Sequence, residues 1–357
     1  MPDSPLSVLH TVSGSTLLDE NGWMIPDHYG SVTEEHQAVR RSVGIADQSH
    51  RGKLRVTGKD CQAFLHRMVT NNIQSLSPGQ GVYACLLTPQ GKILTDMTVG
   101  MREQDFLIDV EPGMASVLKT ALDRYAVMDD VTIEDFTQQY GLIGVYGPCA
   151  TELLRKVIGP FPDLVDCHNY SSVYHEGTLF LTRTRRTGET DYDVYCPSDR
   201  APDLWKAFLE HGAAWGVRPV GHRALEWLRV EAGIPRYGAE LDERIIPNEA
   251  IKERAVSFTK GCYVGQEPVV MMEHRGRPNR LLAGLRISGD LIPEHNTVLN
   301  KDDQEAGWIT TAVRGDGGVI ALGFVRRKFL TPGESLMVET AEGIAEAVLI
   351  ELPFYRK

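Results

Sequence analysis

The pattern of apolar residues changes at Arg280, and this change limits the possible folds more than any other feature of the chain. Before Arg280, helical spacings alternate with strand-like runs, whereas helical periodicity is absent after it. The tail holds short apolar runs separated by glycine and proline, at 281–287, 307–313, 319–324, 335–338 and 344–350. Short, evenly punctuated runs are typical of a small antiparallel β-barrel. We therefore predict that residues 281–357 form a β-barrel domain whose strands pair mainly with each other.

The part before Arg280 predicts an α+β arrangement. Residues 1–31 look irregular, and a helix is expected over 32–43 with Gly44 as the residue that ends it. The elements predicted next are a helix at 61–69, strands at 82–87, 93–99 and 105–110, a helix opened by Pro112, and strands at 131–136 and 142–146. This order predicts a lobe built on an antiparallel sheet.

Composition narrows the class of protein. The 357 residues carry a net charge of −11, which argues against a broad nucleic-acid-binding surface. The six cysteines are scattered with no C-x-x-C pair, so we predict no metal site and a reduced, cytoplasmic protein. We expect no signal peptide and no membrane-spanning segment, and the lack of an unexplained apolar stripe favours a monomer.

Eight residues at 260–267 concentrate more reactive groups than any other stretch. They are Lys260, Gly261, Cys262, Tyr263, Val264, Gly265, Gln266 and Glu267. Two glycines permit a tight turn, and Pro268 favours the start of a helix. A thiol near a lysine and a helix N-terminus has more thiolate character, so Cys262 is a candidate nucleophile. The alternative is an inert structural cysteine in a loop.

Several stretches together resemble a known family. They include residues 44–49, 56–60 and 228–233, Gly91-Lys92-Ile93 ahead of Asp96, and the closing β-domain. They resemble the folate-binding superfamily that joins the glycine-cleavage T-protein, an aminomethyltransferase, to the YgfZ group. The 260–267 stretch matches the YgfZ signature K-G-C-Y-x-G-Q-E, whereas T-proteins usually have Asp-Phe in place of Cys262-Tyr263.

The resemblance implies a three-lobed α+β fold around a folate-sized opening. Two lobes would interleave within residues 1–275, and the C-terminal antiparallel β-barrel would complete the ring. The implied ligand is tetrahydrofolate or a one-carbon derivative.

The resemblance also implies site residues. Tyr83 and Asp96 fall where T-proteins have a pocket tyrosine and the aspartate nearest the reacting folate nitrogen. Asp96 stands among apolar strand residues, so its carboxylate must be hydrogen-bonded or face a cavity. Asp193 occupies the place of the glutamate that holds the pterin edge, with Glu189 as a second candidate. We expect Tyr83, Asp96 and Asp193 to line one cavity, with the Cys262 thiol facing it.

Two positions depart from the T-protein pattern. Leu225 stands where T-proteins place an arginine, and Arg223 is expected to point elsewhere. Glu111 replaces a ligand-binding asparagine. The departures and the Cys262 signature favour a YgfZ-like, folate-binding accessory protein that supports iron–sulfur enzymes. The alternatives are a folate-dependent aminomethyltransferase and a non-catalytic binding module.

Overall fold

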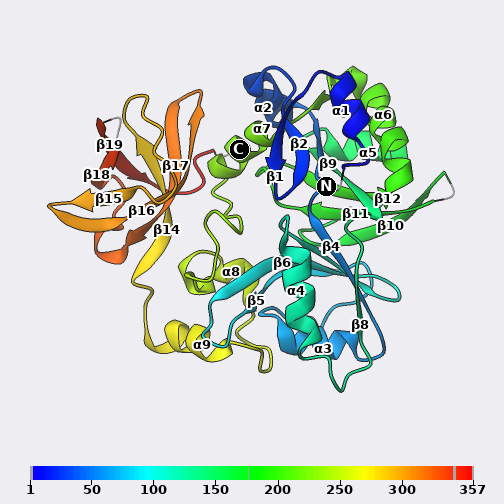
Figure 1. Ribbon diagram of the computed structural model, residues 1–357, viewed down its shortest axis with the longest axis horizontal. Helices are drawn as coiled ribbons and strands as arrows, with labels where there is room; N and C mark the ends of the chain where they lie inside the picture. Colours follow the sequence, from blue (N-terminus) through cyan, green and yellow to red (C-terminus); the bar gives the residue numbers. More distant parts are fainter. Residues whose placement is uncertain (1–2, 176, 341–342, 356–357) are drawn as a thin grey trace.

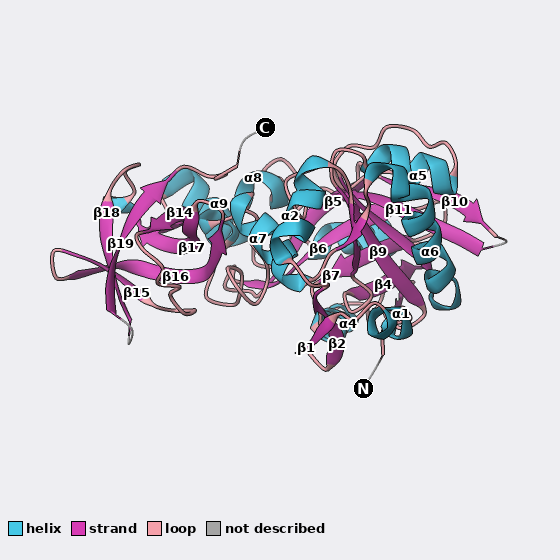
Figure 2. Cartoon of the chain, turned by 90° about the horizontal axis from the view of Figure 1, so that it is seen from above, coloured by secondary structure: helices cyan, strands magenta, loops and turns pink. Residues whose placement is uncertain are grey.

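The computed structural model describes residues 3–175, 177–340 and 343–355, which form three lobes (Figure 1). Two lobes are built on open sheets, and the third is a closed barrel that lies at one end of the molecule (Figure 2). The predicted α+β, three-lobed fold with a C-terminal antiparallel β-barrel is confirmed.

The first lobe is a six-stranded sheet with helices on both faces. Its strand order is β10 (Asn169–Tyr174), β11 (Gly177–Thr184), β12 (Asp191–Pro197), β9 (Tyr140–Tyr146), β3 (Gly44–Asp47) and β13 (Arg218–Pro219). Apolar faces of α5 (Ala150–Ile158) and α6 (Ala201–Gly212) pack on one side of the sheet. On the other side, α2 (Val32–Arg41) and α7 (His222–Glu231) contribute Val39, Ala224 and Leu228 to a second apolar cluster.

The second lobe is a five-stranded antiparallel sheet. Its strand order is β5 (Gly81–Leu87), β6 (Ile93–Met101), β7 (Phe106–Val110), β4 (Gly52–Thr57) and β8 (Thr132–Asp135). Two helices, α3 (Cys61–Met68) and α4 (Met114–Asp123), contribute Phe64, Leu65 and Leu118 to its core. The chain leaves the first sheet after β3, completes the second, and returns at β9.

The N-terminal part is regular, so the prediction of an irregular segment was wrong. Helix α1 (Ser7–Val12) is followed by a hairpin of β1 (Thr16–Glu20) and β2 (Trp23–His28). Asn21 and Gly22 form its turn with φ of 53° and 82°. Asn-Gly is the strongest short hairpin signal, but β1 is largely exposed and lacks the alternation that would have revealed a strand.

Gly44 was also predicted wrongly as the residue that ends α2. It opens β3, and a Cβ there would lie 2.5 Å from a methyl carbon of Val220. The glycine therefore allows close packing between the sheet and the segment before α7.

The segment after α7 crosses the second lobe before it reaches the barrel. It contains two short helices, α8 (Lys252–Ala255) and α9 (Gln266–Arg275), and packs Ile245, Ile251 and Val269 against β5 and β6. Six antiparallel strands then close the barrel, in the order β14 (Arg280–Ile287), β17 (Gly318–Arg326), β16 (Gln304–Gly315), β15 (Val298–Lys301), β18 (Ser335–Thr340) and β19 (Gly343–Ile350). Among the described barrel residues, the only helical turn is a 3-10 turn at Arg327–Phe329. No helix in the described ranges is long and apolar enough to cross a membrane.

Candidate functional site

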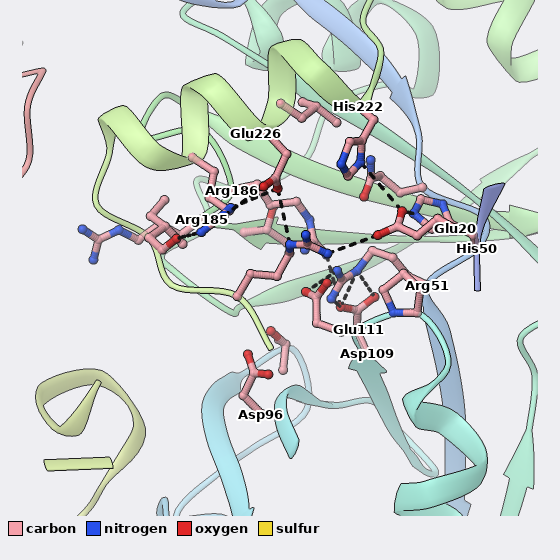
Figure 3. Close-up of a pocket in the computed structure, with 18 of the residues that line it drawn as sticks. Glu20, His50, Arg51, Asp96, Asp109, Glu111, Arg185, Arg186, His222 and Glu226 are labelled. Atoms are coloured by element: carbon pink, nitrogen blue, oxygen red, sulfur yellow. Dashed lines mark hydrogen bonds and ion pairs between the residues drawn. The ribbon is translucent and has the colours of Figure 1, made fainter. Parts of the chain in front are cut away.

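A cavity, which we call the central cavity, lies where the two sheet lobes meet the segment around α7 (Figure 3). The cavity and its open mouth together hold about 1040 Å³ of empty space, which suits a ligand of drug or cofactor size. Its wall includes residues from β1, β5, β6, β7 and α7, and from the loop after β11.

Asp96 places a partly unsatisfied carboxylate in this wall. It is 7% exposed, and its Oδ2 accepts a 2.6 Å hydrogen bond from the Tyr83 hydroxyl. Its Oδ1 is buried and has no hydrogen-bond partner among the described residues. Burial and the negative charge of Glu111 raise the pKa of Asp96 to about 6. Asp96 is therefore mainly ionised at neutral pH and has one oxygen available to a ligand.

Tyr83 is held from two sides. Its hydroxyl bonds Asp96, and the guanidinium of Arg254 lies 4.2 Å from its ring centroid. Arg254 is itself held by Asp166, at N–O distances of 3.0 and 3.1 Å. Tyr83 and Asp96, predicted together from the sequence, do line the same cavity.

Glu111 also lines the central cavity, but its carboxylate is paired. It binds Arg51, whose guanidinium also holds the buried Asp109. Arg186 approaches Asp109 from the opposite lobe at 3.1 Å. The Arg186–Asp109 ion pair joins the two lobes at the cavity wall, whereas the pairs of Arg51 lie within the second lobe (Figure 3).

Asp193 does not line the cavity, and the prediction that it shares this wall with Tyr83 and Asp96 was wrong. It is 0% exposed, and both of its oxygens are bound, one by the Tyr146 hydroxyl at 2.9 Å and the other by Arg186. Arg186 lines the cavity in its place. The Arg186 side chain covers the Asp193 carboxylate, although the two residues lie seven positions apart. The sequence alone does not show this contact, so Asp193 was predicted to face the cavity.

The second pterin candidate, Glu189, is held by Arg40 at 3.0 Å. Leu225 lines the cavity, and Arg223 pairs with Asp27 outside it, as the sequence indicated.

The cavity wall also contains a cluster of charged residues that sequence reasoning missed. Glu20 lies within 4 Å of His50, His222 and Arg236. Although burial alone would raise its pKa, this cluster lowers the pKa of Glu20 to about 2.

Cys262 is exposed, as expected for a loop thiol, but it does not line the central cavity, so the predicted orientation was wrong. Helix α9 begins at Gln266, four residues after the thiol. Lys260 is engaged elsewhere, because its Nζ donates to the carbonyl oxygens of His66, Val69 and Asn71.

Other members of the 260–267 stretch serve packing. The Tyr263 side chain is buried in the cluster that joins β5 to the segment after α7. Gly265 has a φ of 76°, and a Cβ there would lie 2.3 Å from the Thr88 carbonyl oxygen in the β5–β6 turn. Gly261, Gln266 and Glu267 are not among the described residues that line the central cavity. The stretch therefore braces the hairpin that carries Tyr83 and Asp96.

Comparisons with known proteins agree over nearly the whole chain. Residues 6–260 match the GCVT N-terminal domain, and residues 280–356 match the glycine cleavage T-protein C-terminal barrel domain. An aminomethyltransferase of Desulforamulus reducens is 31% identical, covering 99% of this chain and 98% of its own. One from Chlorobium phaeobacteroides is 30% identical, covering 97% and 96%.

A solved structure shows the same fold. The crystal structure of glycine cleavage system aminomethyltransferase T from Bartonella henselae superposes with a TM-score of 0.91 and 25% identity, covering 99% of this chain and 98% of that one. These relatives overturn the favoured prediction of a YgfZ-like accessory protein for iron–sulfur enzymes, which was wrong. That prediction relied on the departures at Leu225 and Glu111 and on the 260–267 stretch, whose members mainly support packing. The chain belongs to the glycine-cleavage T-protein family.

Proposed function

We propose that the protein is a folate-dependent aminomethyltransferase that passes a one-carbon unit to tetrahydrofolate. The relatives that match its full length carry the name aminomethyltransferase. The observation that carries the proposal is the Oδ1 of Asp96, which is buried at the central cavity without a partner among the described residues. A buried polar atom without a hydrogen bond is costly unless a ligand supplies one.

The cavity suits an amine-bearing ligand. Asp96 offers a negatively charged acceptor, and Tyr83 orients it by binding its other oxygen. Bound tetrahydrofolate would supply the amine nitrogens that receive the one-carbon unit. An aminomethyl donor carries positive charge on nitrogen, which a buried carboxylate stabilises more strongly than water does. Glu111 and Arg51 keep the adjacent wall rigid through their ion pair.

The remaining site residues take supporting roles in this proposal. Asp193 acts through Arg186, which presents its guanidinium to the cavity while Asp193 holds it from behind. Cys262 takes no part in transfer, because its thiol lies outside the cavity wall.

The test is substitution of Asp96 by asparagine, which keeps the size of the side chain and removes its charge. Asp96→Asn should bind tetrahydrofolate by titration calorimetry but release ammonia from an aminomethylated lipoyl carrier protein about 100-fold more slowly. Glu134→Gln is the matched control, because Glu134 is an exposed acid on the same sheet. Full activity of Asp96→Asn, or a wild-type protein that binds no tetrahydrofolate, would contradict the proposal.

A further inference from the structure

Arg254 lies where three parts of the molecule meet. It belongs to α8, in the segment between α7 and the barrel, and its guanidinium binds the Asp166 carboxylate through two nitrogens at 3.0 and 3.1 Å. Asp166 belongs to the loop between α5 and β10 in the first lobe. The guanidinium carbon also lies 4.2 Å from the ring centroid of Tyr83, on β5 of the second lobe. One side chain therefore connects the first lobe to the strand that carries Tyr83.

The backbone of α8 is fixed beside β5 by other residues (Figure 1). The Asn71 side-chain amide donates to the carbonyl oxygens of Tyr83 and Arg254, at 2.9 and 3.0 Å. The Thr70 hydroxyl donates to the carbonyl oxygen of Ala255 at 2.6 Å. A substitution of the Arg254 side chain should therefore leave α8 in place and change only the contacts of the guanidinium.

The turn that presents Asp166 contains a strained residue. Cys167 has a φ of 65°, in a region that residues other than glycine rarely adopt. Its carbonyl oxygen approaches β5 so closely that a Cβ at Gly81 would lie 2.2 Å away. Backbone strain of this kind clusters at functional sites. The close approach keeps Asp166 within reach of Arg254.

The contact with Arg254 affects Tyr83 in two ways. A cation over an aromatic face is attracted to it, so Arg254 restricts the position of the ring. Burial and the charge of Asp96 raise the pKa of Tyr83 well above its usual value, and the charge of Arg254 opposes that rise. Tyr83 is therefore protonated at neutral pH, and the arginine makes its hydroxyl a stronger donor to Asp96.

Tyr83 in turn fixes Asp96. Its hydroxyl binds Oδ2 at 2.6 Å, while Oδ1 has no partner within the described ranges. Burial and the charge of Glu111 raise the pKa of Asp96 to about 6, and the hydrogen bond from Tyr83 limits that rise. The other titratable groups that act on Asp96 or respond to its charge are Cys85 on β5, Arg51 before β4 and Tyr237 after α7. A displaced Tyr83 would leave Asp96 less ionised and its free oxygen less well oriented.

We propose that Arg254 is a positioning residue for the transfer reaction, which holds the Tyr83 ring so that its hydroxyl orients the Asp96 carboxylate. This inference rests on the proposed function. Asp166 anchors Arg254, so a loop of the first lobe supports the orientation of an acid on the second. Arg254 therefore contributes to the rate of transfer and not to the affinity for folate.

The test measures transfer and folate binding separately on the full chain. Arg254→Met removes the charge and keeps a long side chain. At saturating tetrahydrofolate it should release ammonia from the aminomethylated lipoyl carrier protein about tenfold more slowly, with the Kd for tetrahydrofolate changed by less than about twofold. The acid limb of the rate, at about pH 6 in wild type, should move up by about half a pH unit. Arg254→Lys keeps a charge over the ring and should restore the acid limb and part of the rate.

A double-mutant cycle tests whether Arg254 acts through Tyr83. In a Tyr83→Phe background, Arg254→Met should slow transfer further by less than about twofold. Asp166→Asn alters an exposed side chain and should slow wild type about threefold, but not the Arg254→Met variant. Arg244→Met is the matched control and should change neither rate nor affinity. Arg244 pairs with Asp242 at the surface of the same segment and is not among the described residues that line the central cavity.

An Arg254→Met variant with the wild-type rate, or with a loss of rate that matches a loss of folate affinity, would overturn the positioning role and leave the proposed function intact. Equal effects of Arg254→Met in the wild-type and Tyr83→Phe backgrounds would also overturn it. If Arg254→Met fails to fold, Asp166→Asn decides, because a wild-type rate and acid limb in that variant would contradict the proposal. If wild type transfers no one-carbon unit, the proposed function fails together with this inference.

Discussion

Asp96 differs from the other acids of the central cavity because its charge has no basic partner. Asp109 is bound by Arg51 and Arg186, and Glu111 is bound by Arg51. Asp96 instead accepts one neutral hydroxyl and keeps its second oxygen unpartnered among the described residues. A folded protein keeps a buried carboxylate oxygen without a partner, despite the energetic cost, where a ligand supplies the missing hydrogen bond.

This arrangement predicts how stability depends on pH. The pKa of Asp96 is raised from its ordinary value of 3.8 to about 6 in the folded protein. Between pH 3.8 and about pH 6, Asp96 is protonated in the folded state and ionised in the unfolded chain. The free energy of unfolding that the bound proton contributes at low pH is therefore lost as the pH rises through about 6. From about pH 5 to about pH 7.5, wild type should lose about 1 kcal/mol more unfolding free energy than Asp96→Asn.

Urea unfolding of both proteins at the two pH values measures the difference. Glu134→Gln should follow the wild-type curve, because its side chain is exposed in the same sheet. Parallel losses in wild type and Asp96→Asn would show that Asp96 does not titrate in this range.

Among the elements, the loop that precedes α9 holds the β5–β6 hairpin and the end of α3 in place. Lys260 donates to the carbonyl oxygens of His66 and Asn71, which lie at and beyond the last turn of α3. Gly265 packs against the carbonyl of Thr88 in the hairpin turn. Because β6 continues from this turn to Asp96, the loop supports the site although none of its residues lines the central cavity.

We expect two members of the 260–267 stretch to respond differently to substitution. Lys260→Met removes the donor from three carbonyl oxygens and should lower the unfolding free energy by about 2–3 kcal/mol. Cys262→Ser alters an exposed side chain and should change it by less than about 0.5 kcal/mol, with transfer activity retained. Chemical unfolding and the ammonia-release assay measure these effects. A Cys262→Ser variant that folds normally but lacks transfer activity would show that the thiol takes part in the reaction.

In the whole molecule, a buried ionic network joins the barrel to the other lobes. Arg229 of α7 binds Glu240 at 2.7 Å, and Glu240 accepts hydrogen bonds from Thr310 and Thr311 of β16. The C-terminal segment adds a second connection, because the backbone N–H of Phe354 donates to the Glu231 carbonyl oxygen. The barrel is thus attached directly to the helix that lines the central cavity.

Breaking this network should loosen the barrel. Arg229→Met would leave Glu240, which is 1% exposed, as a buried charge without its arginine, and should cost about 3–5 kcal/mol. Calorimetry should show a lower Tm for the single variant and a partial recovery for Arg229→Met/Glu240→Leu, which removes both charges. A single variant that costs less than about 1 kcal/mol would mean that apolar packing alone attaches the barrel.

The sequence by itself determined the local elements and the terminal barrel. Apolar spacing and turn residues act within a few positions, so the strands around 82–99 and the helix at 61–69 could be predicted from them. The resemblance to the family placed Tyr83 and Asp96 in one cavity, and the structure shows them there on adjacent strands of one hairpin. The exposed β1 escaped detection, since its residues lack the alternation of a half-buried strand.

Only the tertiary structure decided which polar groups remain available to a ligand. The sequence suggested Asp193 as a ligand contact, but Arg186 covers it. It also suggested Lys260 as a neighbour of the Cys262 thiol, but Lys260 binds carbonyl oxygens in and just after the distant helix α3. The charge of a side chain in a folded protein depends on groups that are close in space but often distant in the chain, and local residue patterns do not show which groups those are.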